Sequence, residues 1–242
     1  DKARMNFVSG LRSHVLHELA DGLRTVWQHE VEPELRRRAR PAHSGRDVHA
    51  AIRTNEYFRF YSAIRVTAQD MVYQAVRPMI ERGAESLTAS AAQLARSQPL
   101  GSLRLDPALD VPRSVSAIDI HLMPGSYHTE VCADDVSAGA LYDRGVYLYT
   151  NGRMGPRNAD PGESAVAFFK EEFPGLAPRR ILDLGCTVGN STLPWVEAFP
   201  EAEVHGIDVC APVLRYAHAR AESLGIHLHL SPQNAESTRL PD

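Results

Sequence analysis

Hydrophobic side chains recur with a helical period at the beginning of the chain. They occupy Phe7, Leu11, Val15, Leu19, Leu23 and Trp27, and Val8, Leu16 and Val26 widen the stripe. Because positions four apart lie on one face of an α-helix, the pattern predicts a long amphipathic helix packed against a core or a partner helix. Pro33, followed by Pro41 and Gly45, is expected to end this helix.

Two further helices are predicted before residue 100. We expect Pro78 to disturb the first of them, whose apolar residues are Tyr57, Tyr61, Ile64, Ala68, Met71, Val72 and Val76. The second is the alanine- and serine-rich stretch 84–96. Packing in the core is the expected use of the aromatic side chains in this region, with a substrate pocket as the alternative; they are Tyr57, Phe58, Phe60 and Tyr61.

The middle of the chain has weaker patterns. Residues 98–112 carry three prolines and a glycine and predict a loop. Val115–Met123 is apolar and β-prone, so we expect a strand here, ended by the turn signal Pro124-Gly125. The Tyr- and Gly-rich stretch 141–155 gives no clear element, and a loop packed against a ligand is one interpretation. Residues 161–173 predict a short helix with Pro161 in its first turn.

From Arg180 onward the pattern alternates between strand and helix. Short apolar runs predict strands at Ile181–Leu184, Val204–Ile207 and Ile226–Leu230, with helices between them. A βαβαβ succession implies parallel strands with right-handed crossovers, and ligands of such sheets bind beyond the carboxyl ends of the strands. We therefore expect Gly185, Asp208 and Asn234, which follow the three strands in turn, to converge on one crevice.

Each of these groups suits a part of an adenosine-containing cofactor. Glycines after the first strand let the backbone turn sharply and approach a ligand closely. The Asp208 carboxylate can accept hydrogen bonds from both hydroxyls of a ribose, and the polar turn after the third strand can meet an adenine edge. The glycine spacing argues against NAD or FAD, because the G-x-G-x-x-G pattern counted from Gly185 finds Thr187 and Asn190 in place of its second and third glycines.

The segment ILDLGCTVGNST resembles the first motif of the class I S-adenosylmethionine-dependent methyltransferases, an acidic residue followed by G-x-G-x-G. The resemblance continues through HGIDVCAPVLRYAHARA and through QNAESTRLPD, which is similar to the family's GDAE-x-LP-x-x-D segment. It covers residues 180–242. Two departures stand out: Thr187 replaces the middle glycine, and Asn234 stands where the family often has aspartate.

The resemblance implies S-adenosylmethionine as the cofactor and a set of residues that bind it. Asp183 is expected to hold the glycine loop and to bind the methionine amine. Asp208 is expected to bind the ribose hydroxyls, and Asn234 and Ala235 are expected to contact the adenine. The full set of expected cofactor-binding residues is Asp183, Gly185, Cys186, Thr187, Gly189, Asp208, Val209, Asn234 and Ala235. No residue can be named as a catalytic base, and no metal is expected.

The predicted fold is α/β, a Rossmann-like methyltransferase domain whose first half is visible, preceded by a mainly helical N-terminal region. Residues 1–150 form this helical region, expected to bind substrate, cap the crevice or dimerise, and residues 151–242 form the first half of the cofactor-binding domain. The implied reaction is methyl transfer to an O, N or C nucleophile of a small molecule. A catalytically inactive cofactor-binding or interaction protein is the alternative, and an NAD(P)-dependent oxidoreductase a weaker one.

In the family a fourth strand lies beside the first, and this sequence stops before it. We therefore expect that the natural chain continues beyond Asp242 or that another element, such as Val115–Met123, covers the first strand. Without such cover, the isolated segment is expected to aggregate through the edge of Ile181–Leu184.

Composition adds limits on partners and location. Of 242 residues, 26 are Lys or Arg and 30 are Asp or Glu, giving a net charge of −4, so we expect no nucleic-acid partner. The three cysteines have no C-x-x-C spacing, which argues against zinc and disulfides and favours the cytoplasm. The spacing of His121, His128 and Cys132 matches no metal-binding pattern. No apolar stretch reaches the roughly 20 residues of a membrane span, and a homodimer remains open.

Overall fold

The computed structural model describes residues 1–240, which contacts between residues divide into two compact units. The first unit is Asp1–Ala75, and the second begins at Val76. Helix α5 (Glu56–Arg96) contributes to both units. The predicted organisation into residues 1–150 and 151–242 stays a prediction.

The first unit begins with an almost continuous helical segment. It consists of α1 (Lys2–His14), α2 (Ala20–Val26) and α3 (Glu32–Arg37), joined by π-helical turns at Val15–Leu19 and Trp27–Val31. The predicted long helix is confirmed. Its expected end at Pro33 is wrong, because Pro33 lies in the first turn of α3, where the missing N–H costs little, and the helix continues to Arg37.

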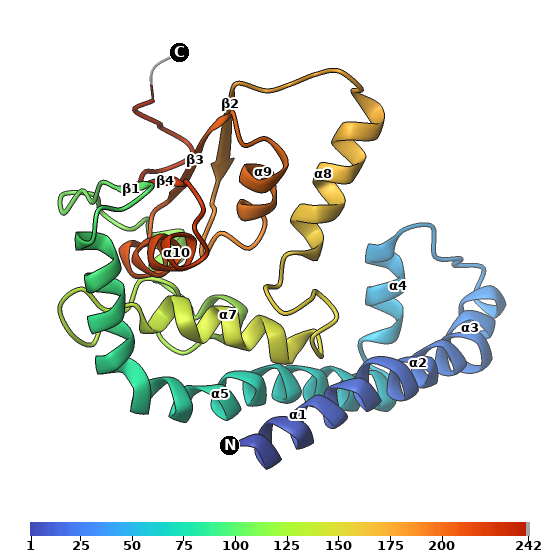
Figure 1. Ribbon diagram of the computed structural model, residues 1–242. Coiled ribbons are helices and arrows are strands. Elements are labelled where there is room, and N and C mark those ends of the chain that lie inside the picture. The colour runs from blue at the N-terminus through green and yellow to red at the C-terminus, as the bar shows by residue number, and fades with distance from the viewer. Residues whose placement is uncertain (241–242) are drawn as a thin grey trace. The chain divides into compact units, whose positions relative to one another are not determined.

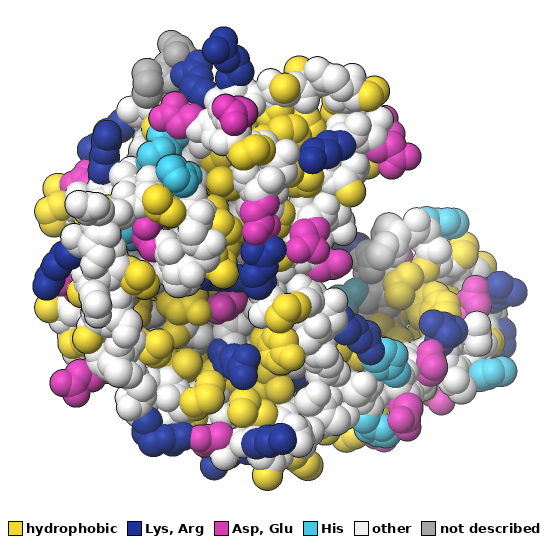
Figure 2. Space-filling model, in the orientation of Figure 1, with side chains coloured by type: hydrophobic (Ala, Val, Ile, Leu, Met, Phe, Trp, Pro, Cys, Tyr) yellow, Lys and Arg dark blue, Asp and Glu magenta, His cyan; other side chains and the backbone are white. Residues whose placement is uncertain are grey.

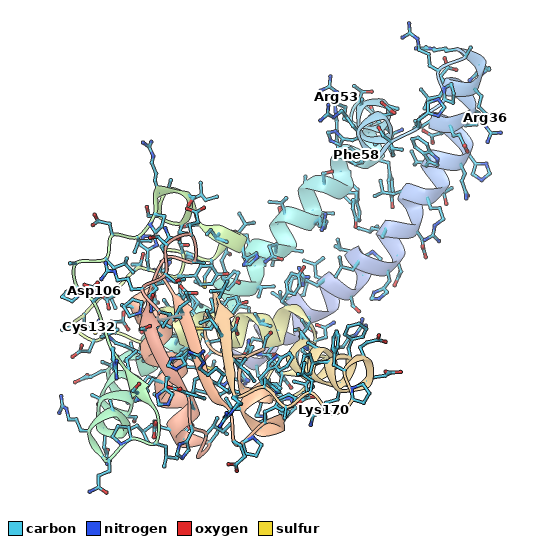
Figure 3. The ribbon with its side chains drawn as sticks, turned by 90° about the horizontal axis from the view of Figure 1, so that it is seen from above. Arg36, Arg53, Phe58, Asp106, Cys132 and Lys170 are labelled. Atoms are coloured by element: carbon cyan, nitrogen blue, oxygen red, sulfur yellow. The ribbon has the colours of Figure 1, made fainter. Side chains whose placement is uncertain are left out.

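Helix α4 (Gly45–Ile52) begins at a side-chain cap. Ser44 is extended, and its Oγ accepts a hydrogen bond from the Asp47 backbone N–H at 3.2 Å. In return, the Asp47 carboxylate accepts from the Ser44 hydroxyl and the His43 N–H, which lowers the pKa of Asp47. Phe58 of α5 packs edge-on against His49 of α4, with ring centroids 5.8 Å apart, and Figure 3 shows Phe58 beside this helix.

Helix α5 joins two segments that were expected to be separate. The pattern at 57–76 and the stretch at 84–96 form one helix, so the expected break at Pro78 is wrong. Proline removes one main-chain hydrogen bond, but burial on one face, at Val76 and Ile80 around it, keeps the helix intact. Within the first unit, Tyr57 of α5 donates its hydroxyl to the Leu19 carbonyl at 2.9 Å.

The second unit contains a parallel four-stranded sheet with the order β1-β4-β3-β2 (Figure 1). Its strands are β1 (Ser102–Leu103), β2 (Arg180–Leu184), β3 (Glu203–Asp208) and β4 (His229–Pro232). Helices α9 (Leu193–Ala198) and α10 (Ala211–Ser223) connect the last three strands. The predicted βαβαβ succession is confirmed, with the third strand beginning three residues later than expected.

One face of the sheet packs on α9 and α10 and forms the core. Leu214, Leu228 and Val204 are fully buried there, and each side chain of this size contributes about 1.5–3 kcal/mol when buried. Gly206 of β3 has no room for a side chain, since a Cβ would lie 2.8 Å from Cys186 Sγ. The absence of a side chain at Gly206 therefore lets the loop after β2 pack directly onto β3.

Two expectations for the middle of the chain are wrong. Residues 98–112 are not only a loop, because Ser102 and Arg104 donate backbone hydrogen bonds to the Leu228 and Leu230 carbonyls and so add β1 to the sheet. Val115–Met123 is not a strand: it holds helix α6 (Arg113–Ser116) and a 3₁₀ turn at Ile120–Leu122. Its apolar residues anchor a compact turn by burying Met123 rather than pairing with a strand.

Two helices complete the second unit, α7 (Ser137–Tyr149) and α8 (Asp160–Glu172). Helix α7 packs on α10 below the sheet in Figure 1. The stretch left unassigned by the sequence is thus mostly helix α7, and the predicted helix at 161–173 is confirmed as α8. Phe169 of α8 packs on Trp195 of α9 with ring centroids 5.4 Å apart.

Strand β2 lies at one edge of the sheet as far as the described residues show, with β3 as its neighbour. Leu182 and Leu184 are accordingly 43 % and 53 % exposed. Val115–Met123 does not cover this edge, and the additional strand β1 lies at the opposite edge, beside β4. Figure 2 shows hydrophobic side chains gathered in parts of the visible face, with basic and acidic side chains interspersed rather than separated.

The contact between α7 and α10 gives the first prediction. A Cβ at Gly139 would lie 2.3 Å from the Cβ of Tyr216, so Gly139→Ala must push the two helices apart. We expect a loss of about 1–3 kcal/mol in the free energy of unfolding, measured with urea.

Gly83→Ala is the matched control for this substitution. Gly83 lies inside α5, and the nearest atom to its Cβ position is a leucine methyl at 3.8 Å, an ordinary contact. Alanine there is expected to stabilise by up to about 1 kcal/mol through helix propensity. Equal stabilities of Gly139→Ala and the unchanged chain would contradict the close packing.

Candidate functional site

The carboxyl ends of β2, β3 and β4 open into a pocket of about 420 Å³. Gly185 and Thr187 line it from the loop after β2, Asp208 and Val209 from the end of β3, and the 233–236 turn from the end of β4. The expected convergence of Gly185, Asp208 and Asn234 on one crevice is therefore observed. The opposite wall comes from residues 112–142, which precede the sheet strands β2 to β4.

The loop after β2 has a left-handed backbone at every second residue. The φ angles are 80° at Gly185, 48° at Thr187 and 77° at Gly189. Glycine adopts this conformation without cost, whereas a residue with a Cβ is strained by about 1–3 kcal/mol. The G-x-T-x-G sequence thus has glycines at two of the three left-handed positions. At the third position it has a threonine, and a glycine there would remove the backbone strain.

Strand β3 holds this loop through two acceptors. The Ile207 carbonyl accepts hydrogen bonds from the N–H groups of Gly185, at 2.8 Å, and Cys186, at 3.0 Å. The Asp208 carboxylate accepts from the N–H of Thr187, at 3.1 Å, and of Cys210, at 2.9 Å. The loop conformation is therefore fixed from the neighbouring strand.

Asp208 is the most buried carboxylate that lines the pocket, with 8 % of its surface exposed. Burial raises the pKa of Asp208, and the hydrogen bonds from the backbone N–H groups of Cys210 and Thr187 oppose that rise. Each carboxylate oxygen has two lone pairs, so both oxygens can accept a second donor from a ligand.

Three of the predicted cofactor-binding residues, one at the end of β2 and two in the loop itself, do not line the pocket. Asp183 accepts the hydroxyl of buried Thr192 at 2.6 Å and so fastens the start of α9 to the end of β2. Cys186 is 4 % exposed, and burial raises the pKa of its thiol well above the ordinary range. Gly189 closes the turn by donating its N–H to the Cys186 carbonyl at 2.8 Å.

The turn after β4 carries the residues expected near an adenine. Asn234 and Ala235 both line the pocket. The Asn234 side-chain oxygen accepts the Glu236 N–H at 2.9 Å, and its backbone carbonyl accepts the Ser237 N–H at 2.9 Å. The turn is joined to β3 because Gln233 donates its N–H to the Asp208 carbonyl at 3.0 Å. The last residues of the third motif, Pro241 and Asp242, lie outside the described residues.

Three aromatic residues that also line the pocket form a wall, and sequence reasoning suggests a ligand contact only for the stretch 141–155, which contains one of them. The wall consists of His121, Tyr127 and Tyr142. His121 Nδ1 lies 2.5 Å from the Tyr127 hydroxyl, and the Tyr127 and Tyr142 rings meet edge to face at 5.1 Å. Burial, and after it the charges of Asp143 and Asp208, raise the pKa of Tyr142, which keeps its hydroxyl protonated.

A partly buried polar cluster supports the pocket from α7 and α10. Asp143 of α7 accepts hydrogen bonds from Asn158, at 2.9 Å, and from the Tyr216 hydroxyl, at 3.0 Å. Arg220 of α10 donates to the Val188 carbonyl at 3.1 Å and also to Asn190 and to the Arg157 carbonyl. The glycine loop is thus held from below by α10 as well as from β3.

The described part of the chain has no metal site, disulfide or membrane-spanning helix beside this pocket. No group of three or more His, Cys, Asp or Glu side chains there is arranged to hold a metal ion. Cys132 is exposed on a loop on the same side of the sheet as Asp106 (Figure 3), and all three cysteines are free thiols. Among these residues, no helix combines the length and the apolar character that crossing a membrane requires.

Comparison with known proteins identifies the segment that contains the sheet strands β2 to β4. Residues 181–242 match the family model described as a methyltransferase domain. Residues 181–242 are therefore similar to the class I S-adenosylmethionine-dependent methyltransferases. The predicted resemblance and the Rossmann-like α/β fold of this methyltransferase segment are both confirmed.

The relatives of the methyltransferase segment share it over short stretches. A trans-aconitate 2-methyltransferase of Rhodopseudomonas palustris is 49 % identical over 49 residues, which are 20 % of this chain and 19 % of the relative. A demethylmenaquinone methyltransferase of Thermus thermophilus is 38 % identical over 66 residues, which are 27 % of this chain and 30 % of the relative. The chain therefore spans less than a third of the length of either relative.

The strained threonine of the methyltransferase segment gives the second prediction. Thr187→Gly removes the left-handed strain at φ 48°, so we expect the free energy of unfolding to rise by about 1 kcal/mol. Thr187→Ala is the control, because alanine removes the hydroxyl but keeps a Cβ in the strained conformation. If urea unfolding gives the same stability for the glycine and alanine variants, the left-handed φ at position 187 does not lower the free energy of unfolding.

Proposed function

We propose that this chain binds S-adenosylmethionine and transfers its methyl group to an O, N or C nucleophile of a small molecule. The observation that carries the proposal is the convergence of Gly185, Asp208 and Asn234 on one pocket, within a segment that matches a methyltransferase-domain model. S-adenosylmethionine, when bound, supplies an electrophilic methyl group on a sulfonium.

The residues around the pocket fit such a cofactor. Nothing lies within 4 Å of a Cβ built on Gly185, so a ligand can approach the loop backbone there. Under the proposal, Asp208 accepts the ribose hydroxyls and Asn234 with Ala235 meets the adenine. Val209 supplies apolar contact beside them.

The predicted cofactor-binding residues that do not line the pocket have a supporting part in this proposal. Asp183, Cys186 and Gly189 set the shape of the loop through Thr192, the close packing on Gly206 and the turn hydrogen bond. Asp183 is also assigned the methionine amine by the family resemblance. Catalysis is proposed to come mainly from holding donor and acceptor in line, which converts a reaction between two molecules into an effectively intramolecular one.

The partners belong to the proposal as well. The two relatives are named for trans-aconitate and for demethylmenaquinone, both small molecules, which supports a small-molecule acceptor here. We propose no nucleic-acid or membrane partner. The proposed location is the cytoplasm, which the three free thiols support, and a homodimer is the alternative to a monomer.

The ribose contact gives the third prediction. Asp208→Asn keeps the shape of the side chain but removes its charge, so we expect the affinity for S-adenosylhomocysteine to fall by roughly 2–3 kcal/mol. Calorimetric titration measures the change. Asp106→Asn removes the same charge from a residue that does not line the pocket and pairs with Arg239, and it should leave the affinity unchanged. Equal affinities of the two variants would place the cofactor elsewhere.

The raised pKa of Asp208 gives the fourth prediction. The ionised carboxylate is the stronger acceptor, so the affinity for S-adenosylhomocysteine should fall as the pH falls through the pKa of Asp208 in the free protein. Because that pKa is raised, the fall begins at a higher pH than for an ordinary aspartate. The sign for stability is the opposite: the buried ionised form costs stability as the pH rises through the same range.

Calorimetry at a series of pH values tests this dependence. Asp208→Asn is the control, because it has no carboxyl group to titrate and its affinity should be flat over the same range. A wild-type affinity that stays constant until the protein unfolds in acid would contradict the assignment.

A further inference from the structure

The charge of the pocket wall limits which methyl acceptor it can take. Among the described residues that line the pocket, Asp208 and Glu236 are the formally charged ones, and no Lys or Arg is present. An acceptor with several carboxylates needs cationic or bidentate Arg partners to offset the loss of hydration. The wall therefore disfavours a polycarboxylate and suits an uncharged acceptor.

The shape and polarity of the same wall favour a ring. Val115, Ile120, Tyr127 and Tyr142 present apolar and aromatic surface to the pocket. Aromatic side chains bind flat rings by offset stacking or edge-to-face contacts, each worth about 0.5–1.5 kcal/mol beyond burial. The Tyr127 and Tyr142 rings already meet at 71°, which leaves ring faces and edges as contact surfaces.

Among the described residues of this wall, His121 is the one that carries an imidazole, the side chain that most often acts as a general base in enzymes. Its ring stands edge-on to Tyr127 at 89°, with Nδ1 at 2.5 Å from the tyrosine hydroxyl. When Nδ1–H donates to that hydroxyl, Nε2 is the nitrogen with a lone pair. The other titratable groups that line the pocket with His121 are Tyr127, Tyr142, Asp208, Cys210 and Glu236.

The backbone that carries His121 is strained. His121 and Leu122 follow each other with φ angles of 58° and 60°, a conformation that costs about 1–3 kcal/mol for each residue. Met123, which is fully buried, and the turn hydrogen bonds from Leu122 to Asp119 and from Met123 to Ile120 hold the strained turn. Such outliers concentrate at functional sites, and this one places an imidazole on the pocket wall.

We propose that His121 is the catalytic base for methyl transfer to an uncharged, ring-bearing acceptor with an ionisable hydroxyl, a phenol or an enol. This inference rests on the proposed function. As the acceptor oxygen attacks the sulfonium methyl carbon, the C–S bond breaks and its electron pair stays on sulfur. The hydroxyl proton moves to His121 Nε2, and the products are the methyl ether and S-adenosylhomocysteine. Tyr127 is a positioning residue that orients the imidazole.

The test uses 4-nitrophenol as the acceptor probe, because its ionised form absorbs visible light. It is added to the 242-residue chain saturated with S-adenosylhomocysteine, and the phenolate absorption is followed against pH. In the unchanged chain we expect the ionisation constant of the bound phenol to rise at least tenfold over that of the free phenol. His121→Gln should abolish this rise, and Tyr127→Phe should reduce it because the imidazole loses the hydroxyl that orients it.

His128→Gln is the matched control, since His128 lies in the same segment but does not line the pocket, and it should keep the full rise. Trans-aconitate is added as a competitor and should not displace the phenol. Retention of the rise in His121→Gln, or displacement of the phenol by trans-aconitate at equal concentration, would overturn the inference. Calorimetry with S-adenosylhomocysteine is run on the unchanged chain and on every variant. If the unchanged chain does not bind it, the proposed function fails. If it binds but His121→Gln keeps the full rise, only the role of His121 fails.

Discussion

The loop after β2 depends on two acceptors at the end of β3, the Ile207 carbonyl and the Asp208 carboxylate. Between them they receive three N–H groups of the loop, from Gly185, Cys186 and Thr187. A loop with left-handed backbone at alternate residues leaves these N–H groups without helical or ladder partners, and unpaired buried donors cost about 1–3 kcal/mol each. The acid that faces the proposed ribose is therefore also the residue that holds the glycine loop, and the two tasks cannot be separated by removing it.

The elements that could be predicted are those whose signals lie in short, continuous stretches of sequence. The strands β2, β3 and β4 show as apolar runs, and the turns between strand and helix show as glycines and polar residues. Gly185, Asp208 and Asn234 could be placed in one crevice because parallel strands end at the same edge. Thr187 could be recognised as unusual from the motif, while its φ of 48° explains the cost in physical terms.

The rest depends on partners that are distant in sequence. Strand β1 has only two residues, and its pairing comes from carbonyls near β4. The hydrophobic pattern at Val115–Met123 indicates that side chains are buried, but it does not indicate that the backbone pairs with a strand. Burial of Met123 in a turn is equally consistent with the pattern. His121, Tyr127 and Tyr142 form a wall only once α7 lies on α10, so no spacing in the sequence connects them with the cofactor crevice.

Strand β1 also has a consequence for how the chain folds. The carboxylate of Glu222 in α10 accepts the N–H groups of Leu100 and Gly101, both at 2.8 Å, and so aligns β1 beside β4. Every residue between β1 and β4 must already be in the chain before this pair can form, and parallel pairings over such a span form slowly. During synthesis at the ribosome, residues 100–104 therefore have no strand partner until α10 and β4 have been synthesised. The edge of the sheet beside β4 can therefore close only after β4 itself is in place.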